Sequence, residues 1–148
     1  MSISNIKEAS EACGITAIIS NSSEKIETQL NRITGVEELP IMLVSWDLEG
    51  QLEFDENGFL KNPSIGVVVL LMTKAENRIK EEYEEAAEEM ASLYQKFLFS
   101  LNSLLVKYNK ENGPSVTNIN YTLAPMYGMG KHSGILGRFT MIDQITNC

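Results

Sequence analysis

The chain has 148 residues, of which 43% are hydrophobic, and no long linker divides it, so the sequence predicts one domain over residues 1–148. Its formal net charge of −8 argues against a general nucleic-acid-binding protein, because such binding depends on Lys and Arg that neutralise phosphates. With only two cysteines and one histidine, the composition also excludes a disulfide framework and a four-ligand zinc site.

The N-terminal segment is expected to be largely helical. Residues 1–8 lack the basic-then-apolar order of a secretory signal, and no apolar run is long enough to span a bilayer, so we expect a soluble protein made in the cytoplasm, without membrane contact. Asn5–Ala12 is predicted as an amphipathic helix that stops at Gly14. Ile15–Ile19 is rich in β-branched residues and fits either a strand or more of that helix. A second helix is predicted at Glu24–Ile33.

A small antiparallel meander is predicted next. A proline introduces the apolar strand Ile41–Trp46, because a residue without an N–H is tolerated where a strand begins. Residues 47–50 turn the chain, Gln51–Phe54 alternates polar and apolar residues, and Asn57-Gly58 is typical of tight hairpin turns. The meander leads to Ile65–Met72, which is rich in Val and too short for a membrane helix, so it is predicted as a buried core strand.

The longest periodic segment of the chain follows this strand directly. Thr73–Glu76 matches a capping box, so a helix is predicted to start there, and Gly113-Pro114 is predicted to end it. Such a helix would be roughly 50 Å long. A globule of this chain length has a diameter of about 40 Å, so the helix is expected to bend or to project towards a partner. Its inward face is predicted from apolar residues spaced three or four apart: Ile79, Tyr83, Ala86, Met90, Leu93, Phe97, Leu101, Leu104 and Tyr108.

The C-terminal part is predicted to form a hairpin of two strands. Asn118–Leu123 alternates polar and apolar residues, a glycine-rich loop covers residues 125–134, and Ile135–Ile142 is the closing strand. Gly137 interrupts that strand and indicates either a bulge or a close backbone approach. The whole pattern predicts an α+β fold, in which an antiparallel or mixed sheet is packed by one long helix, with a helical N-terminal segment.

Three sequence features could indicate a binding site, but none has the residues at the spacing that its motif requires. Gly128–Lys131 is similar to a phosphate-binding loop, but the leading glycine and the Ser or Thr after the lysine are missing, and a strand follows. The acidic stretches 47–49 and 55–58 lack the ligand spacing of an EF-hand and are explained as hairpin turns. Six glutamates within residues 81–89 have no Glu-x-x-His partner and fit a solvated helix face. The sequence therefore predicts no cofactor and no metal.

Catalytic residues are not expected either. Cys13 and His132 could act as a nucleophile and a base, but the sequence names no third group to orient them. A single histidine in a glycine-rich loop is more often an ordinary surface residue. We therefore expect no enzymatic activity.

The order of the predicted helices and strands, over nearly the whole chain, is similar to that of a known protein family. A helix, a strand after Leu39-Pro40, a hairpin, an apolar strand and a long helix precede a glycine-punctuated hairpin that ends in Ser133–Ile142 and a short polar tail. This order resembles the tail terminator and tail-completion (neck) proteins of bacteriophages. The resemblance implies a structural virion protein without a cofactor, a homo-oligomeric ring that joins other tail or connector proteins. It also implies that DNA passes through the ring without specific binding, for which an acidic chain is suited.

An oligomer interface is expected on the long helix and the glycine-rich loop. Phe99 and Val106 lie opposite the main apolar face and are seven residues apart, so they stack on the helix surface. In the alternative, a loop or the N-terminal helix of the same chain covers them. From the loop, Tyr127, Met129 and Lys131 are expected at the interface. A competing function is a small intracellular ligand-binding or enzyme domain that uses the loop at residues 125–134 as a lid.

Overall fold

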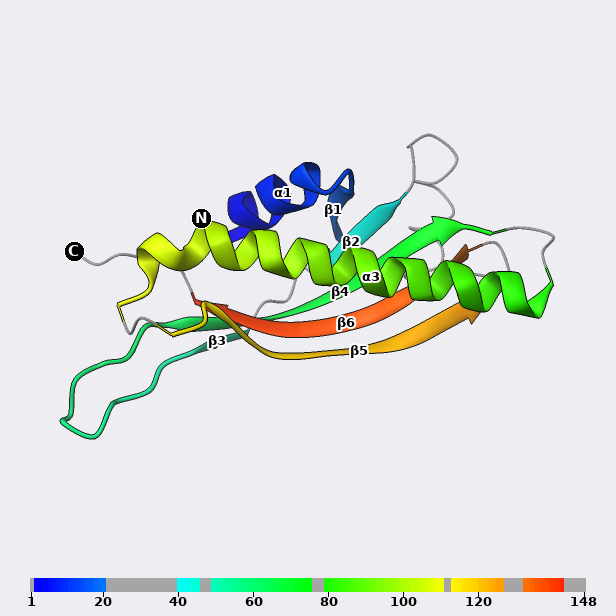
Figure 1. Cartoon of the computed structure of the whole chain (residues 1–148). Helices are drawn as coiled ribbons and strands as arrows, with labels where there is room; N and C mark the ends of the chain where they lie inside the picture. Colours follow the sequence, from blue (N-terminus) through cyan, green and yellow to red (C-terminus); the bar gives the residue numbers. More distant parts are fainter. Residues whose placement is uncertain are drawn as a thin grey trace.

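The computed structural model describes residues 2–20, 40–45, 49–75, 79–110, 113–126 and 132–142. Within these ranges, a six-stranded mixed sheet packs against a long helix, α3, and a shorter helix, α1, lies beside α3 (Figure 1). The predicted α+β class, with one long helix over the sheet and a helical N-terminal segment, is therefore confirmed. No helix in the described part of the chain has the length and hydrophobicity needed to cross a membrane.

The sheet has the strand order β1-β2-β4-β6-β5, and β3 pairs with one end of β4. β1 and β2 are parallel, whereas the other strand pairs are antiparallel. β4 is the central strand, because it is hydrogen-bonded to β2, β3 and β6. The strands are β1 Thr16–Ser20, β2 Ile41–Ser45, β3 Glu49–Gln51, β4 Ser64–Lys74, β5 Val116–Met126 and β6 His132–Ile142.

Helix α1 leads directly into the first strand of the sheet. It spans Ser2–Ala12 and is followed by Gly14, whose φ of 73° is a left-handed conformation that glycine adopts without strain. Ile6 and Ala9 are buried against the main core, as predicted for an amphipathic helix. β1 pairs with β2 along its whole length, so the ambiguous segment Ile15–Ile19 is a strand from Thr16 onwards.

Both faces of β4 carry apolar clusters, because alternate residues of a strand point to opposite sides. Val67, Val69 and Leu71 belong to the main core with α1 and α3. Leu70 and Met72 belong to a smaller cluster with residues of β2. The prediction of a buried core strand from its continuous apolar run is confirmed.

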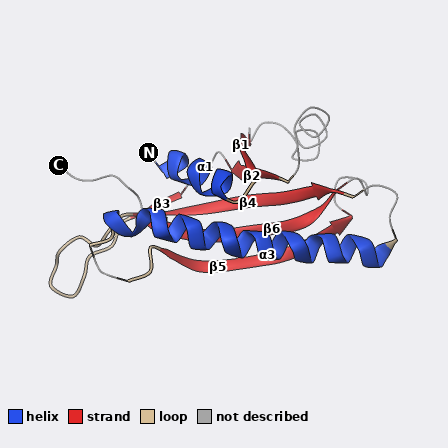
Figure 2. Cartoon of the chain, turned by 45° about the horizontal axis from the view of Figure 1, so that its top comes forward, coloured by secondary structure: helices blue, strands red, loops and turns tan. Residues whose placement is uncertain are grey.

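Helix α3 lies along the strands, and its first turns reach past the ends of β4 and β5 (Figures 1 and 2). It spans Lys80–Leu105, 26 residues, which is roughly 39 Å. The strands β4, β5 and β6 have eleven residues each, about 36 Å, so helix and strands are similar in length. The helix is therefore shorter than the roughly 50 Å predicted, and the molecule is elongated where a spherical globule was assumed (Figure 1). The buried face of the helix is formed by Tyr83, Ala86, Ala87, Met90, Ala91, Tyr94, Phe97, Leu98, Leu101 and Leu105.

The predicted start of the long helix is wrong. Thr73 and Lys74 remain in β4, where they pair with the first residues of β6, so their backbones belong to the sheet and do not cap a helix. The helix begins at Lys80 after Ile79, which makes no side-chain capping hydrogen bond. Ile79 is exposed, not inward as predicted, because it precedes the first helical turn.

The predicted end of the long helix is also wrong. After Leu105 the chain makes one 3₁₀ turn, Val106–Tyr108, and it is already extended at Asn109. Gly113-Pro114 follows later and leads into β5. The helix therefore stops before the glycine and proline that were expected to end it.

Helix α3 also holds the beginning of β5. Asn102 accepts hydrogen bonds at Oδ1 from the backbone N–H groups of Ser115 and Val116, at 2.7 and 3.0 Å. The register of β5 against β6 then shifts between Thr117 and Asn120. The irregularity of this hairpin therefore lies in β5.

Tyr94 connects α3 to the middle of the C-terminal hairpin. Its ring is fully buried, and its hydroxyl donates to the carbonyl oxygens of Arg138 at 3.1 Å and Asn120 at 3.4 Å. Burial raises the pKa of Tyr94 above its ordinary value, so the hydroxyl keeps its proton and remains a donor. A Cβ atom on Gly137 would lie 2.6 Å from Cζ of Tyr94. Of the two alternatives for Gly137, the close approach is therefore the one observed.

The C-terminal hairpin is longer than predicted. β5 and β6 each extend beyond the predicted strands Asn118–Leu123 and Ile135–Ile142. The Ser133 hydroxyl donates to the backbone carbonyl of Tyr83 at 2.5 Å and joins the start of β6 to α3. The predicted helix Glu24–Ile33, residues 46–48 and residues 127–131 lie outside the described part of the chain.

Candidate interaction surfaces

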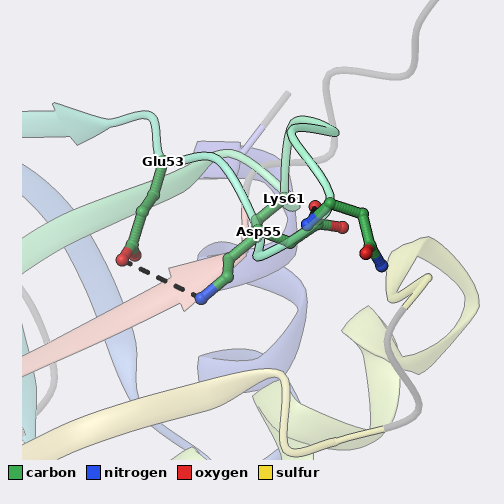
Figure 3. Close-up of polar contacts among 4 residues, drawn as sticks. Glu53, Asp55 and Lys61 are labelled. Carbon is green, nitrogen blue, oxygen red and sulfur yellow. Dashed lines mark hydrogen bonds and ion pairs between the residues drawn. The ribbon is translucent and has the colours of Figure 1, made fainter.

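A hairpin-shaped arm, residues 52–63, extends beyond the end of the sheet (Figure 1). β3 pairs with the first residues of β4, and the chain between them continues outward (Figures 1 and 2). Phe54 and Leu60 form a bridge, and the backbone N–H of Lys61 donates to the carbonyl of Glu53 at 2.8 Å. Figure 3 shows the ion pair across the arm, 3.8 Å between Lys61 Nζ and Glu53 Oε1. The arm is therefore a hydrogen-bonded ribbon.

Asp55 organises the tip of the arm. Its Oδ1 accepts hydrogen bonds from the backbone N–H groups of Asn57 and Phe59, both at 2.9 Å. Gly58 has a φ of 81° and donates its N–H to the carbonyl of Asp55 at 3.1 Å. The predicted hairpin turn at Asn57-Gly58 is confirmed, and this acidic stretch is explained by turn formation, as predicted.

The arm exposes large apolar side chains to solvent. Four of them, Leu52, Phe54, Phe59 and Leu60, are between 51% and 72% exposed. Polar and charged residues flank them along the arm, namely Glu53, Asp55, Glu56, Asn57, Lys61 and Asn62. Exposed apolar patches with a polar rim are typical of protein–protein interaction sites. The arm is therefore the first candidate interaction surface.

The base of the arm is fastened to the end of α3. Asn62 Nδ2 donates to Asn109 Oδ1 at 3.0 Å. Asn109 Nδ2 in turn donates to the carbonyl of Gly113 at 2.6 Å and to Ser115 Oγ at 3.2 Å. These hydrogen bonds fix the base of the arm relative to both α3 and β5.

An apolar groove between α3 and β5 is the second candidate surface. It has a volume of about 340 Å³. Phe99, which is 78% exposed, contributes from the helix, and Ile119 contributes from the strand. No other large apolar side chain in the described ranges is as exposed as Phe99. The lining residues of the groove are Gln95, Leu98, Phe99, Asn102, Pro114, Val116 and Ile119.

The edge strand β5 continues the groove. Tyr121 and Leu123 pair with Gly137 and Ile135, which face α3, so both lie on the helix side of the sheet and extend a β5 stripe that begins at Ile119. All three stripe residues are exposed. β5 contains no charged residue, although edge strands are commonly protected from pairing by charged side chains. The uncharged edge therefore adds to the apolar surface of the groove.

Charge is divided unequally between the two surfaces. The arm carries three carboxylates and one lysine, a net charge of −2. Residues 92–126, which include both walls of the groove, carry three lysines and one glutamate, a net charge of +2. The first half of α3 holds the six exposed glutamates, and their predicted role as a solvated helix face is confirmed. The groove thus lies on a basic part of an acidic chain.

The predicted interface residues fall into two groups. Phe99 and Val106 are exposed, at 78% and 63%, so the outward stripe on the helix is confirmed. Neither α1 nor any other described part of the chain covers these two residues, contrary to the alternative. Tyr127, Met129 and Lys131 lie outside the described residues, as does the centre of the loop that the lid hypothesis needs.

The two residues considered for catalysis have restricted environments. His132 is 2% exposed within β6, so the expectation of a surface residue is wrong, because the strand begins earlier than predicted. Cys13 is partly buried after α1, and burial raises the pKa of its thiol despite the opposing effect of Lys96. A raised pKa disfavours the nucleophilic thiolate. In the described ranges, no cluster of three or more His, Cys, Asp or Glu residues is placed to hold a metal.

Two comparisons with known proteins found no match. The chain matches no protein-family model, and no curated protein matches it significantly. The arm and the groove are therefore the features from which a function can be argued.

The sequence alone did not reveal the arm or the β5 side of the groove. The alternation in Gln51–Phe54 predicts a strand, but only Gln51 belongs to one, and Leu52 and Phe54 are exposed. A usable signal is the length of chain between β3 and β4, which is more than a tight hairpin turn requires. Ile119 lies far in sequence from Phe99, so helical spacing alone does not reveal the groove.

Proposed function

We propose that the protein is a structural subunit that assembles into a homo-oligomeric ring, as a tail terminator or head–tail joining (neck) subunit of a bacteriophage. The observation that carries this proposal is the arm, an ordered ribbon with four exposed apolar side chains. Burying one such side chain is worth roughly 1.5–3 kcal/mol. Covering the arm therefore favours association strongly.

The presence of a second apolar surface favours a ring over a dimer. The groove and the arm involve different residues, so one subunit can use both at the same time. Contacts between unlike surfaces add subunits in one direction, and the assembly closes into a ring when the rotation per subunit allows it.

The assignment to a phage virion rests on the order of the elements and on charge. The order resembles that of tail terminator and tail-completion proteins, in which a ring connects the tail to connector proteins. A chain with a net charge of −8 repels DNA phosphates, which suits a channel through which DNA passes without specific binding. The mature location is then the virion, after synthesis in the host cytoplasm.

Size-exclusion chromatography with light scattering tests assembly. We expect a discrete oligomer larger than a dimer, and ring-shaped particles of uniform diameter in negative-stain electron microscopy. A protein that remains monomeric at its highest soluble concentration contradicts the proposal. The phage assignment is tested separately by the neighbouring genes: portal, capsid or tail-tube genes support it, and an unrelated metabolic operon contradicts it.

A further inference from the structure

We propose that the arm of one subunit inserts into the groove of a second copy of the chain and makes the head-to-tail contact of the ring. This inference rests on the proposed self-assembly and names the two surfaces that would form it.

The apolar chemistry of the two surfaces is matched. The arm presents Phe54 and Phe59, and the groove presents Phe99 with Ile119 beside it. Aromatic rings pack favourably edge to face as well as offset, so an arm ring can rest against Phe99 without close alignment. The β5 stripe continues the apolar surface for the rest of the arm.

Charge favours contact between an arm and a groove over contact between two arms or between two grooves. The arm has a net charge of −2, whereas residues 92–126, which include both walls of the groove, have a net charge of +2. Two arms placed together would repel each other, and so would two grooves. Complementary charge guides partners into one register, so it selects the arm for the groove. A symmetric dimer built from one surface alone has no such support.

Both surfaces are available in the same subunit. The apolar side chains of the arm are exposed, and so are Phe99 and Ile119, so the arm does not fill the groove of its own chain. Asn62 fastens the base of the arm to Asn109 and restrains it from swinging. The groove is therefore open to an arm from another copy.

The experiment uses two double variants, each with two apolar residues replaced by glutamate, and one control. The arm variant is Phe54→Glu with Phe59→Glu, and the groove variant is Phe99→Glu with Ile119→Glu. All four positions are exposed, so circular dichroism should show an unchanged fold. The control is Ile79→Glu, an exposed isoleucine at the start of α3, where a carboxylate is compatible with the helix dipole.

We expect each double variant alone to be monomeric and the control to assemble as the wild type does. An equal mixture of the two variants should give a heterodimer and nothing larger. The groove variant still has an intact arm, which can bind the intact groove of the arm variant. The heterodimer then has one altered arm and one altered groove left, so it cannot add a third subunit. Light scattering measures this as a doubling of mass.

The outcomes separate this inference from the proposed function. If the wild type assembles and either double variant also assembles alone, the arm-in-groove contact is wrong and the ring stands. Monomeric variants that form no heterodimer when mixed also overturn the contact. If the wild type itself is monomeric, self-assembly fails.

Cross-linking provides a second measurement that does not depend on the charged variants. With Cys13 and Cys148 replaced by serine, Phe54→Cys and Phe99→Cys are introduced into one chain. On oxidation, we expect a ladder of disulfide-linked multimers, because every contact joins one arm to one groove. Chains with only one of the two cysteines should give no ladder. Oxidised chains with both cysteines that remain single overturn the contact.

Discussion

Replacing Gly137 with alanine should destabilise the protein substantially, because the added methyl group enters space that Tyr94 occupies. The new Cβ would lie 2.6 Å from Cζ and 2.8 Å from the hydroxyl oxygen of Tyr94. The tyrosine is fully buried at the centre of α3, and the rings of Phe139 and Tyr121 lie at centroid distances of 6.4 and 6.3 Å. It therefore cannot move without disturbing the buried Phe139 or the neighbouring Tyr121.

The expected magnitude has two parts. Overpacking a core by one methyl group costs about 1–3 kcal/mol. Displacing the Tyr94 hydroxyl weakens its hydrogen bonding to the carbonyls of Arg138 and Asn120, which costs about 0.5–1.5 kcal/mol in total because the hydroxyl has one proton for both acceptors. Together the two parts give a loss of about 1.5–4.5 kcal/mol in the free energy of unfolding. At about 3 °C per kcal/mol, the melting temperature should fall by roughly 4–14 °C.

Thermal and urea unfolding followed by circular dichroism measure this loss. Gly113→Ala is the matched control: no atom lies within 4 Å of its added Cβ, so its stability should be unchanged or slightly higher. A double-mutant cycle with Tyr94→Phe tests the cause. The hydroxyl should matter less in the alanine background, where it is already displaced, so the two changes should not be additive. Additive effects, or a Gly137→Ala melting curve that overlays the wild type, would refute the reasoning.

Three further changes follow from the described contacts. Asn102→Ala should lower the free energy of unfolding in urea by about 1–3 kcal/mol, because the buried N–H groups of Ser115 and Val116 lose their acceptor; an unchanged midpoint would contradict this. Asn62→Ala should accelerate hydrogen exchange in the arm while the melting temperature changes little, and equal protection would show that the base is held by other contacts. In a Cys148→Ser chain, alkylation of Cys13 should reach half its maximal rate at a higher pH than for a solvent-exposed thiol, because a raised pKa leaves less thiolate at any given pH.

The sequence predicted those elements whose burial is encoded by their own periodicity. The inward face of α3 follows the helical repeat from Tyr83 through Phe97 to Leu101, and all three are buried. The apolar run in β4 is long enough to be recognised as a strand covered on both faces. Phe99 and Val106 were placed outward by the same geometry and are exposed.

Features that depend on distant partners could not be predicted in this way. Thr73 has the sequence context of a helix cap, but pairing with Ser133 keeps it in the sheet. Polar and apolar residues alternate around Leu52 and Phe54, and this pattern fits a half-buried strand as well as an exposed ribbon. Only the fold distinguishes the two, because no described element covers these side chains. The groove lies between α3 and β5, two segments that are neighbours only in the folded chain. Neither segment alone therefore predicts it.

The continuity between the arm and β4 has a mechanical consequence. A neighbour that holds the arm pulls on β4 along the axis of the strand. β4 is paired with β6 from Ser64 to Lys74 and with β2 over its second half. Its hydrogen bonds run across the strand, so an axial load acts on them in shear and is shared along the ladder, whereas a sideways load would open them one after another. The subunit is therefore stiffest in the direction in which a neighbour would stretch it.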